Sequence, residues 1–271
     1  MVARVVQLDE LQHLQRVLLI IFELPCEKYL AFKFIATEII EDISFILSEK
    51  GSNGEYLLAE TQKFIQFVIP GLSNTHTREA STRCFMKLCK HTHMFLAEQH
   101  TQEIINTVMP GTAKDWKDDE SSHNILESLA ILICSLVDKD AQKCTEYLKL
   151  VISKIFDPLM EHINWLLELK AKNNGVLKPE DMNQWVYDQC CEYINLVGEF
   201  CKSCSNLTDH NSIFDPIFTD IWGYIEQLLL QFSNLEKMQE AVTRLLKHSL
   251  RISPGLFQQH YLANFLRIVI S

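Results

Sequence analysis

Hydrophobic residues recur at helical spacing along almost the whole chain, without the strict alternation typical of a strand. The region 139–172 reads as one long helix or as two helices broken near Pro158, because an internal proline removes a backbone donor. The pattern predicts the other helices over residues 7–23, 28–49, 56–69, 77–96, 100–108, 121–137, 181–204, 216–232, 236–252 and 256–270.

Glycine and proline mark the expected ends of these helices. Pro25 ends the first helix, "KGSNGE" closes the second, and "PG" follows both the third and the fifth. Thr77 and Asp181 stand where an N-cap would accept a hydrogen bond from the first helical turn. The sequence therefore predicts an all-α protein with short connections.

The order of these helices favours a repeat architecture. An apolar helix followed by a "VIPGL"-like stop and a second helix occurs at 62–72 and again at 103–111. Such a pair cannot bury its apolar stripe alone, so pairs stack into an α-solenoid. We predict a HEAT-like, armadillo-like superhelix over residues 1–271 without separate domains, built from about five or six helix pairs. A compact helical bundle is the alternative.

Composition agrees with a folded, helical and intracellular protein. Hydrophobic residues make up 47% of the 271 residues, and only 8 glycines and 7 prolines occur, which disfavours a turn-rich β protein. The 9 cysteines fall mostly inside apolar helical runs and indicate a reducing compartment. No apolar run reaches the length of a transmembrane helix, so we expect no membrane insertion.

The charge distribution contains one local exception. The formal net charge of −10 disfavours direct nucleic-acid binding and favours basic protein partners. Yet one predicted helix carries Arg244, Lys247, His248 and Arg251 at i, i+3, i+4 and i+7, on one face. We name Arg244, Lys247 and Arg251 the cationic ridge. The ridge is either a binding site for an anionic or phosphorylated segment, or a solvated helix end that favourably meets the helix dipole.

Acidic side chains form a complementary candidate for contacts with basic cargo. Glu38, Glu41 and Asp42 share one side of the second predicted helix. A second group crowds one loop and comprises Asp115, Asp118, Asp119 and Glu120. Loop hydration and solubility are the simpler explanation, and clustered loop carboxylates without a pocket do not make an acid–base pair.

Motifs for catalysis or metal binding are weak. "CKSC" at 201–204 is half a zinc site at most, since Cys190 lies about three turns away on the same predicted helix. His91 and His93 point to different faces of a helix. No Gly-rich phosphate loop, GxSxG elbow or HExxH motif occurs. We therefore expect no enzyme, no catalytic residue, no metal and no cofactor.

Three segments resemble the importin-β superfamily of nuclear transport receptors. "TREASTRCFMKLCKHTHMFL" looks like one of its HEAT-repeat helices. "ILESLAILICSLVDKDAQKCTEYLKLVISKIFDPLMEHINWLLE" is similar to central repeats of the transportin-SR and importin-13 type. "DPIFTDIWGYIEQLLLQFSNLEKMQEAVTRLLKHSLRISPGLF" resembles the next pair, with its basic partner helix. The resemblance covers roughly residues 28–271.

The resemblance implies a karyopherin that shuttles between nucleus and cytoplasm and imports cargo proteins that are basic or rich in Arg-Ser. It also implies binding to the Phe-Gly repeats of nucleoporins and cargo release by Ran bound to GTP. In the transportin-SR branch, a row of arginines grips Arg-Ser segments that are often phosphorylated. The matching row here is Arg244, Lys247 and Arg251. The possible acidic contacts to cargo or Ran are Asp115, Asp118, Asp119 and Glu120.

The chain departs from the family in two respects. Ala241 stands where the row would begin with another arginine, and Lys247 replaces an arginine, so bidentate contact with phosphate is lost there. Full receptors are several times longer and carry their main Ran site in N-terminal repeats that this chain does not match. We therefore expect a middle segment that lacks this Ran site and self-associates through uncapped ends.

The resulting hypothesis is a transport-receptor segment that binds protein cargo without catalysis. A first rival is a HEAT-repeat scaffold or adaptor outside transport, such as a phosphatase regulatory subunit. A second rival is a helical enzyme with a carboxylate or Cys/His centre, for which no residue constellation has the required spacing.

Overall fold

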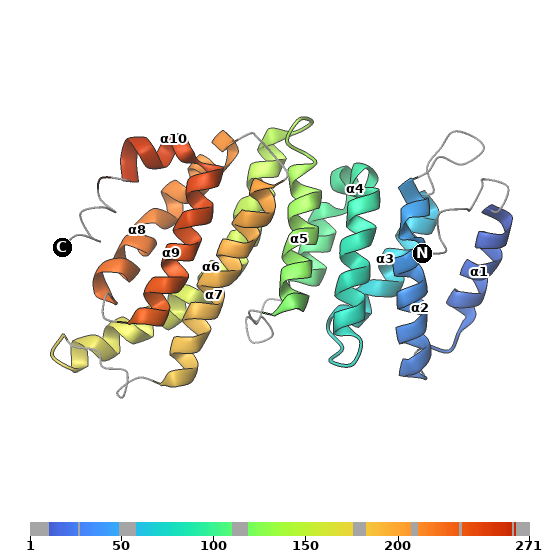
Figure 1. Ribbon diagram of the computed structural model, residues 1–271, viewed down its shortest axis with the longest axis horizontal. Helices are drawn as coiled ribbons and strands as arrows, with labels where there is room; N and C mark the ends of the chain where they lie inside the picture. Colours follow the sequence, from blue (N-terminus) through green and yellow to red (C-terminus); the bar gives the residue numbers. More distant parts are fainter. Residues whose placement is uncertain are drawn as a thin grey trace. The chain divides into compact units, whose positions relative to one another are not determined.

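The computed structural model describes residues 11–26, 28–48, 58–109, 119–175, 183–206, 211–232, 235–261 and 263 (Figure 1). Of these residues 88% are helical, and the helices pack side by side, which confirms the all-α prediction. Within this part of the chain, no helix combines the length and the apolar character needed to cross a bilayer. Contacts divide the chain into two compact units, Met1–His100 and Thr101–Ser271.

The first unit begins with two short helices that are joined at a proline turn. Its elements are α1 (Leu11–Glu23), α2 (Leu30–Ile43), the 3₁₀ helix η3 (Ser44–Ser48), α3 (Leu58–Leu72) and most of α4 (Arg78–Val108). Helix α1 packs on α3 through Phe22, whose ring centroid lies 5.7 Å from that of Phe64 and 5.8 Å from that of Phe67. Helices α2 and α4 are joined by ion pairs described below.

The second unit contains the longer helices. Its elements are the end of α4, α5 (Glu120–Cys134), α6 (Ala141–Lys172), α7 (Gln184–Ser205), the 3₁₀ helix η6 (Asn211–Phe214), α8 (Asp215–Gln231), α9 (Glu236–Ile252), α10 (Pro254–Leu256) and the π-helix η7 (Phe257–Tyr261). The prediction for 236–252 is confirmed at both ends.

Alternate helices of the second unit pack in two rows. Helix α7 packs against α5 on one side and α9 on the other, and Figure 1 shows the three side by side. Helices α6 and α8 contact each other and pack against α7 and α9 respectively, behind the first row in this view. Each helix thus packs mainly on near neighbours in the sequence, as expected for successive helical hairpins.

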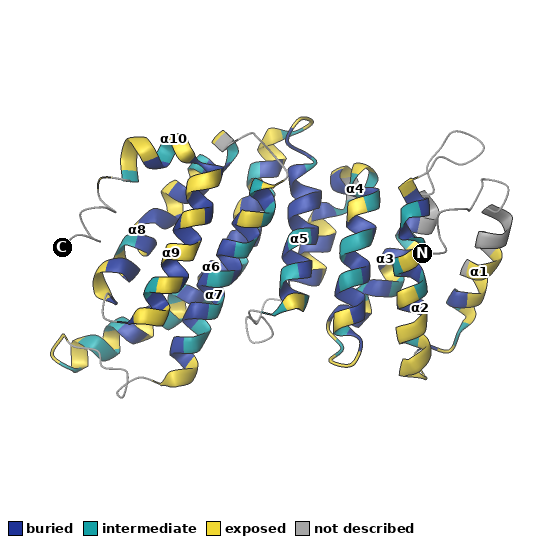
Figure 2. Ribbon diagram, in the orientation of Figure 1, coloured by how far each residue is buried: buried dark blue, intermediate teal, exposed yellow. Residues whose placement is uncertain are grey.

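The core follows the rows of helices (Figure 2). Helix α5 is buried around most of its circumference, which explains its unbroken apolar run "LAILIC" at 129–134. Longer helices bury a single stripe, and those of α7 and α9 meet where Gly198 faces Leu245. An added Cβ on Gly198 would lie 3.5 Å from the Cα of Leu245, so the two backbones approach closely here.

One predicted interruption is wrong. The separate helix at 100–108 is the continuation of α4, because Ala97 and Glu98 favour helix and no glycine or proline intervenes. Of the two alternatives predicted for 139–172, the single long helix is confirmed: α6 runs through Pro158 without ending, since packing of its buried stripe outweighs the loss of one backbone hydrogen bond. Pro70 also lies inside a helix, in the last turn of α3.

The caps differ from those predicted. Thr77 precedes α4, but its hydroxyl donates to the carbonyl oxygen of Gly71 at 3.2 Å. Asp181 lies outside the described residues, and Asn183 caps α7 by accepting from the backbone N–H of Trp185 at 3.0 Å. Asp140 caps α6 in the same way, accepting from the N–H of Lys143 at 3.0 Å, which lowers the pKa of the Asp140 carboxyl.

Candidate functional site: the cationic ridge of α9

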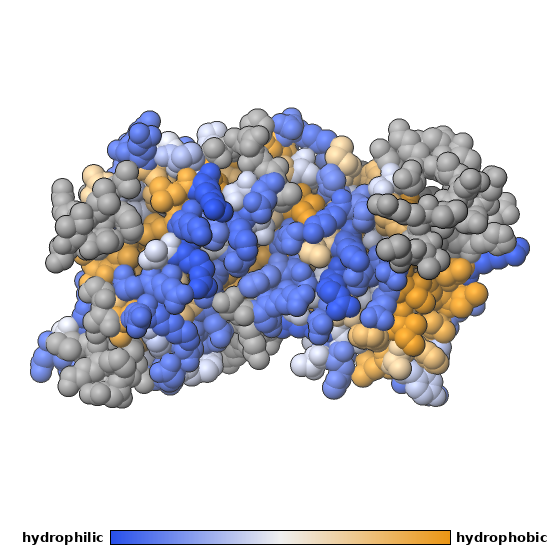
Figure 3. Space-filling view, in the orientation of Figure 1, coloured by the Kyte–Doolittle hydropathy of each residue, from blue (hydrophilic) through white to orange (hydrophobic). Residues whose placement is uncertain are grey.

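Helix α9 is strongly amphipathic, and this places the ridge. One face buries a stripe against α7 and α8 that comprises Met238, Ala241, Val242, Leu245, Leu246, Ser249 and Ile252. The opposite face exposes all three members of the cationic ridge, Arg244, Lys247 and Arg251. Figure 3 shows the corresponding hydrophilic surface along α9.

Helix α9, which carries the cationic ridge, is attached to α7 at the N-terminal end of α9. The backbone N–H of Met238 donates to the hydroxyl of Tyr187 at 3.2 Å. Lys237 forms an ion pair with Asp188, and this bond lowers the pKa of the Asp188 carboxyl. These contacts and the close approach at Gly198 fix the rotation of α9, and therefore the direction in which the ridge points.

Two of the three cations have no acidic partner among the described residues. The guanidinium of Arg244 pairs with the carboxylate of Glu240 one turn earlier, at 2.7 Å. Within the described part of the chain, Lys247 and Arg251 make no ion pair with a carboxylate. Both are therefore available to an external anion, whereas Arg244 would first have to leave Glu240.

His248 does not belong to the exposed ridge, although its spacing placed it there. Its residue surface is only 6% exposed, because it lies on the edge of the apolar stripe beside Leu245 and Ile252. Burial lowers the pKa of its imidazole; the nearby Arg251, Lys202 and Lys247 add to this effect and Glu199 opposes it. Its Nδ1 is buried without a hydrogen-bond partner. His248 is therefore a packing residue of the α9 stripe.

The row also has no cation at its predicted start. Ala241 is only 3% exposed and packs in the stripe that faces α7. A longer side chain there would point into the helix interface, so the exposed row begins at Arg244.

A small polar cavity lies on the neighbouring helices. It has a volume of about 240 Å³ between α5 and α7, lined by His123, Glu127, Glu199, Lys202, Ser203 and Asn206. Lys202 and Glu199 pair with each other at 2.8 Å. Sequence reasoning missed this cavity because its residues come from two helices and share no motif.

The predicted acidic loop is described only in part. Asp115 and Asp118 lie outside the described residues. Asp119 is the N-cap of α5, and its carboxylate accepts from the backbone N–H of Ser122 at 2.8 Å. Glu120 is the first residue of α5 and is exposed, where its charge favourably meets the helix dipole. Both residues thus stabilise a helix start; cargo or Ran contacts by them stay a prediction.

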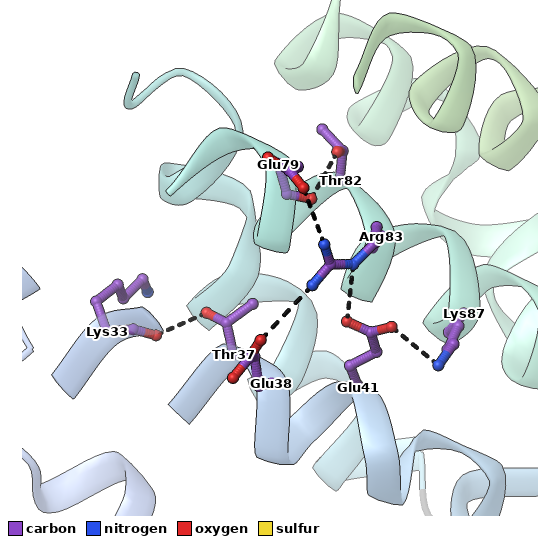
Figure 4. A network of polar contacts seen from close by, with 8 residues as sticks. All are labelled: Lys33, Thr37, Glu38, Glu41, Glu79, Thr82, Arg83 and Lys87. Carbon is purple, nitrogen blue, oxygen red and sulfur yellow. Dashed lines mark hydrogen bonds and ion pairs between the residues drawn. The ribbon is translucent and has the colours of Figure 1, made fainter. Parts of the chain in front are cut away.

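On the acidic side of α2, Glu38 and Glu41 form internal ion pairs (Figure 4), whereas Asp42 is exposed. Arg83 of α4 lies 3.5 Å from Glu41, 3.7 Å from Glu38 and 3.1 Å from Glu79. Lys87 holds the second oxygen of Glu41 at 2.9 Å. The side chain of Glu41 is only 11% exposed, so this pair of cations offsets a mostly buried charge and joins α2 to α4.

The "CKSC" cysteines are core residues. Cys201 and Cys204 are fully buried, and Cys204 lies near Cys134 of α5 and Cys144 of α6. Burial raises the pKa of the Cys201 thiol to about 12. No group of three or more His, Cys, Asp or Glu in the described ranges could hold a metal ion. His91 and His93 belong to no such group.

Comparisons with known proteins returned no significant match to a family model, a curated protein or a solved structure. The resemblance to the importin-β superfamily is thus a prediction from the sequence, and any function of the ridge is argued from its own chemistry.

Proposed function

We propose that this chain acts as an importin-β-like transport receptor, and that α9 binds an acidic or phosphorylated segment of a cargo protein. The supporting observation is the cationic ridge, in which Lys247 and Arg251 project from a packed helix and have no carboxylate partner in the part of the chain that the structure describes. The two rows of neighbouring helices in the second unit support a HEAT-like solenoid as its architecture.

The spacing of the two cations suits a doubly phosphorylated Arg-Ser segment. Lys247 and Arg251 are four residues apart, which corresponds to a rise of about 6 Å along a helix. Successive serines of an extended Arg-Ser peptide, which are two residues apart, are spaced by about 7 Å. Two phosphates could therefore meet two cations in register, while the peptide's arginines face away or pair with Glu240 and other acidic groups.

The mechanism would be binding without catalysis. Arg251 supplies a planar fork for bidentate contact with phosphate, and Lys247 supplies a point charge. Phosphorylation raises the negative charge of the peptide and so favours the complex. Shuttling between nucleus and cytoplasm, and binding to Phe-Gly repeats, belong to the same proposal through the sequence resemblance.

The test is fluorescence anisotropy with a labelled Arg-Ser peptide, phosphorylated and unphosphorylated. The protein is used as wild type and as the Lys247→Glu/Arg251→Glu double variant, with Lys172→Glu as the control. Lys172 is exposed in the last turn of α6, in the same unit, so the control changes charge at a position outside the ridge. We expect the double variant to weaken phosphopeptide binding by about tenfold or more and the control to change it little.

The outcomes separate the proposal from its rival. Binding that prefers the phosphopeptide and is lost only in the double variant supports a cargo site. Equal binding of both peptides, or no binding, would identify the ridge as a solvated helix end and favour a HEAT-like scaffold outside transport.

A further inference from the structure

The first unit exposes an unusual number of large apolar side chains. They come from α1, the turn after it and α2, and comprise Val17, Leu19, Ile20, Tyr29, Leu30, Phe32, Phe34 and Ile35. Leu19 and Ile20 are 60% and 61% exposed. Figure 3 shows the hydrophobic patch that lies over these two helices. A contiguous exposed patch of this kind marks an interaction surface.

The patch adjoins a cavity of about 650 Å³ between the α1–α2 turn and α3. Its walls are mainly apolar and include Phe22, Leu24, Pro25, Leu30, Phe67 and Pro70. This volume is large enough for one or two bulky apolar side chains of a partner. The exposed Leu30 belongs both to the patch and to the cavity wall, so the two are continuous.

The charged residues that line this cavity, among those that the structure describes, are both lysines, Lys28 and Lys33. The ammonium of Lys33 donates to the carbonyl oxygen of Phe67 and lies over its ring. The ammonium of Lys28 lies 5.5 Å from the ring centroid of Tyr29 and makes no ion pair within the described ranges.

We propose that this patch and cavity form a docking groove for an acidic amphipathic segment of a partner protein. Apolar side chains of the segment enter the cavity beside Leu30 and Phe67, and a flanking carboxylate pairs with Lys28. Charge complementarity decides the occupant, because the apolar walls accept any hydrophobic anchor whereas the two lysines disfavour a basic segment and favour an acidic one. This groove is independent of the ridge on α9 and of the function proposed for it.

The probe is a labelled helical peptide with leucines at positions i, i+3, i+4 and i+7 and glutamates beside them. A second peptide carries glutamine in place of every glutamate, and a third is a neutral Phe-Gly peptide. Each is titrated with the full chain by fluorescence anisotropy at low and high salt. We expect the acidic peptide to bind at least about threefold tighter than the glutamine peptide, with the difference reduced by salt.

Two pairs of variants locate the site. Lys28→Glu tests the charge and is matched by Lys90→Glu, an exposed lysine of α4 that does not line the cavity. Leu30→Ser tests the apolar wall and is matched by Met94→Ser, because both side chains are exposed and neither change opens a core. Circular dichroism checks that all four variants remain folded. Lys28→Glu and Leu30→Ser should each weaken the acidic peptide by at least about threefold, and the controls should not.

The other outcomes overturn the proposal. If the glutamine peptide or the Phe-Gly peptide bound with the same affinity as the acidic peptide, the groove would bind apolar side chains without selecting for acidic charge. A dimer in light scattering that is disrupted by Leu30→Ser would identify a second copy as the occupant. Absence of binding by the acidic peptide to a monomeric, folded protein would exclude the groove.

Discussion

The close approach of α7 and α9 at Gly198 predicts opposite effects for two substitutions. An alanine Cβ at position 198 would lie 3.5 Å from the Cα of Leu245, 3.7 Å from its backbone N and 3.9 Å from its Cβ. These are ordinary van der Waals distances, so alanine fits without displacing α9. A leucine at the same position would have to place three further carbon atoms in this contact.

The expected magnitudes follow from helix propensity and packing. Replacing glycine by alanine inside a helix gains about 1 kcal/mol, and each new atomic contact adds only about 0.1–0.2 kcal/mol. Gly198→Ala should therefore raise the free energy of unfolding by about 1 kcal/mol, which corresponds to about 2–4 °C in Tm for a unit of this size. Gly198→Leu should lower the free energy of unfolding by about 1–3 kcal/mol, because it overpacks the interface.

Urea and thermal unfolding, followed by circular dichroism, measure both variants. Because α9 carries the cationic ridge, Gly198→Leu should also lower the affinity for the phosphopeptide, whereas Gly198→Ala should leave that affinity unchanged. Two results would refute this reasoning: a loss of stability in Gly198→Ala as large as in Gly198→Leu, or no change in either. An equal loss in both variants would mean that an added Cβ on Gly198 lies closer than 3.5 Å to the backbone of Leu245. No change in either variant would mean that α7 and α9 do not touch at this point.

Three further predictions concern other buried positions. Gly71→Ala should destabilise the first unit by about 1–3 kcal/mol in urea unfolding, because its Cβ would lie 2.1 Å from Ser81 Oγ. Ser81→Ala removes a buried hydroxyl that has no hydrogen-bond partner among the described residues, so it should be close to neutral alone. In the double variant, Ser81→Ala should restore part of the stability that Gly71→Ala loses. Burial lowers the pKa of His248, so the stability linked to its neutral form is fully present above its unfolded pKa of about 6.5 and is lost as pH falls through the folded pKa. Urea unfolding of His248→Gln at pH 7.5 and 5.5 should therefore show a smaller acid destabilisation than wild type. Cys201 and Cys204 should react with a thiol reagent such as maleimide at pH 7.5 only after unfolding, since both are fully buried; rapid labelling of the native protein would contradict this.

The sequence predicted most of the helices because their signal is local. The apolar stripe of α9 repeats at i, i+3 and i+4, and the boundaries at 236 and 252 follow from it directly. Where a local breaker competes with packing, as at Pro158 inside α6, the pattern left one helix or two open. A proline costs one hydrogen bond, and only the neighbouring helices decide whether burial compensates for it.

The candidate sites divide in the same way. The exposure of Lys247 and Arg251 could be predicted, because they lie opposite the apolar stripe of their own helix. The burial of His248 could not, since it sits on the edge of that stripe and depends on α7. Glu41 looked like part of an acidic surface, and only the arrival of Arg83 and Lys87 from α4 made it an internal ion pair.

What the sequence alone determined is therefore the helical class, most helix positions and the charge along each helix face, all of which depend on neighbours within a turn or two. The tertiary structure decided which charges are neutralised, how the cysteines of α5, α6 and α7 meet in one core, and that the apolar run around α1 and α2 lines a cavity with two lysines. These features join residues that are distant in the chain, and no local pattern encodes which helix face will meet which partner.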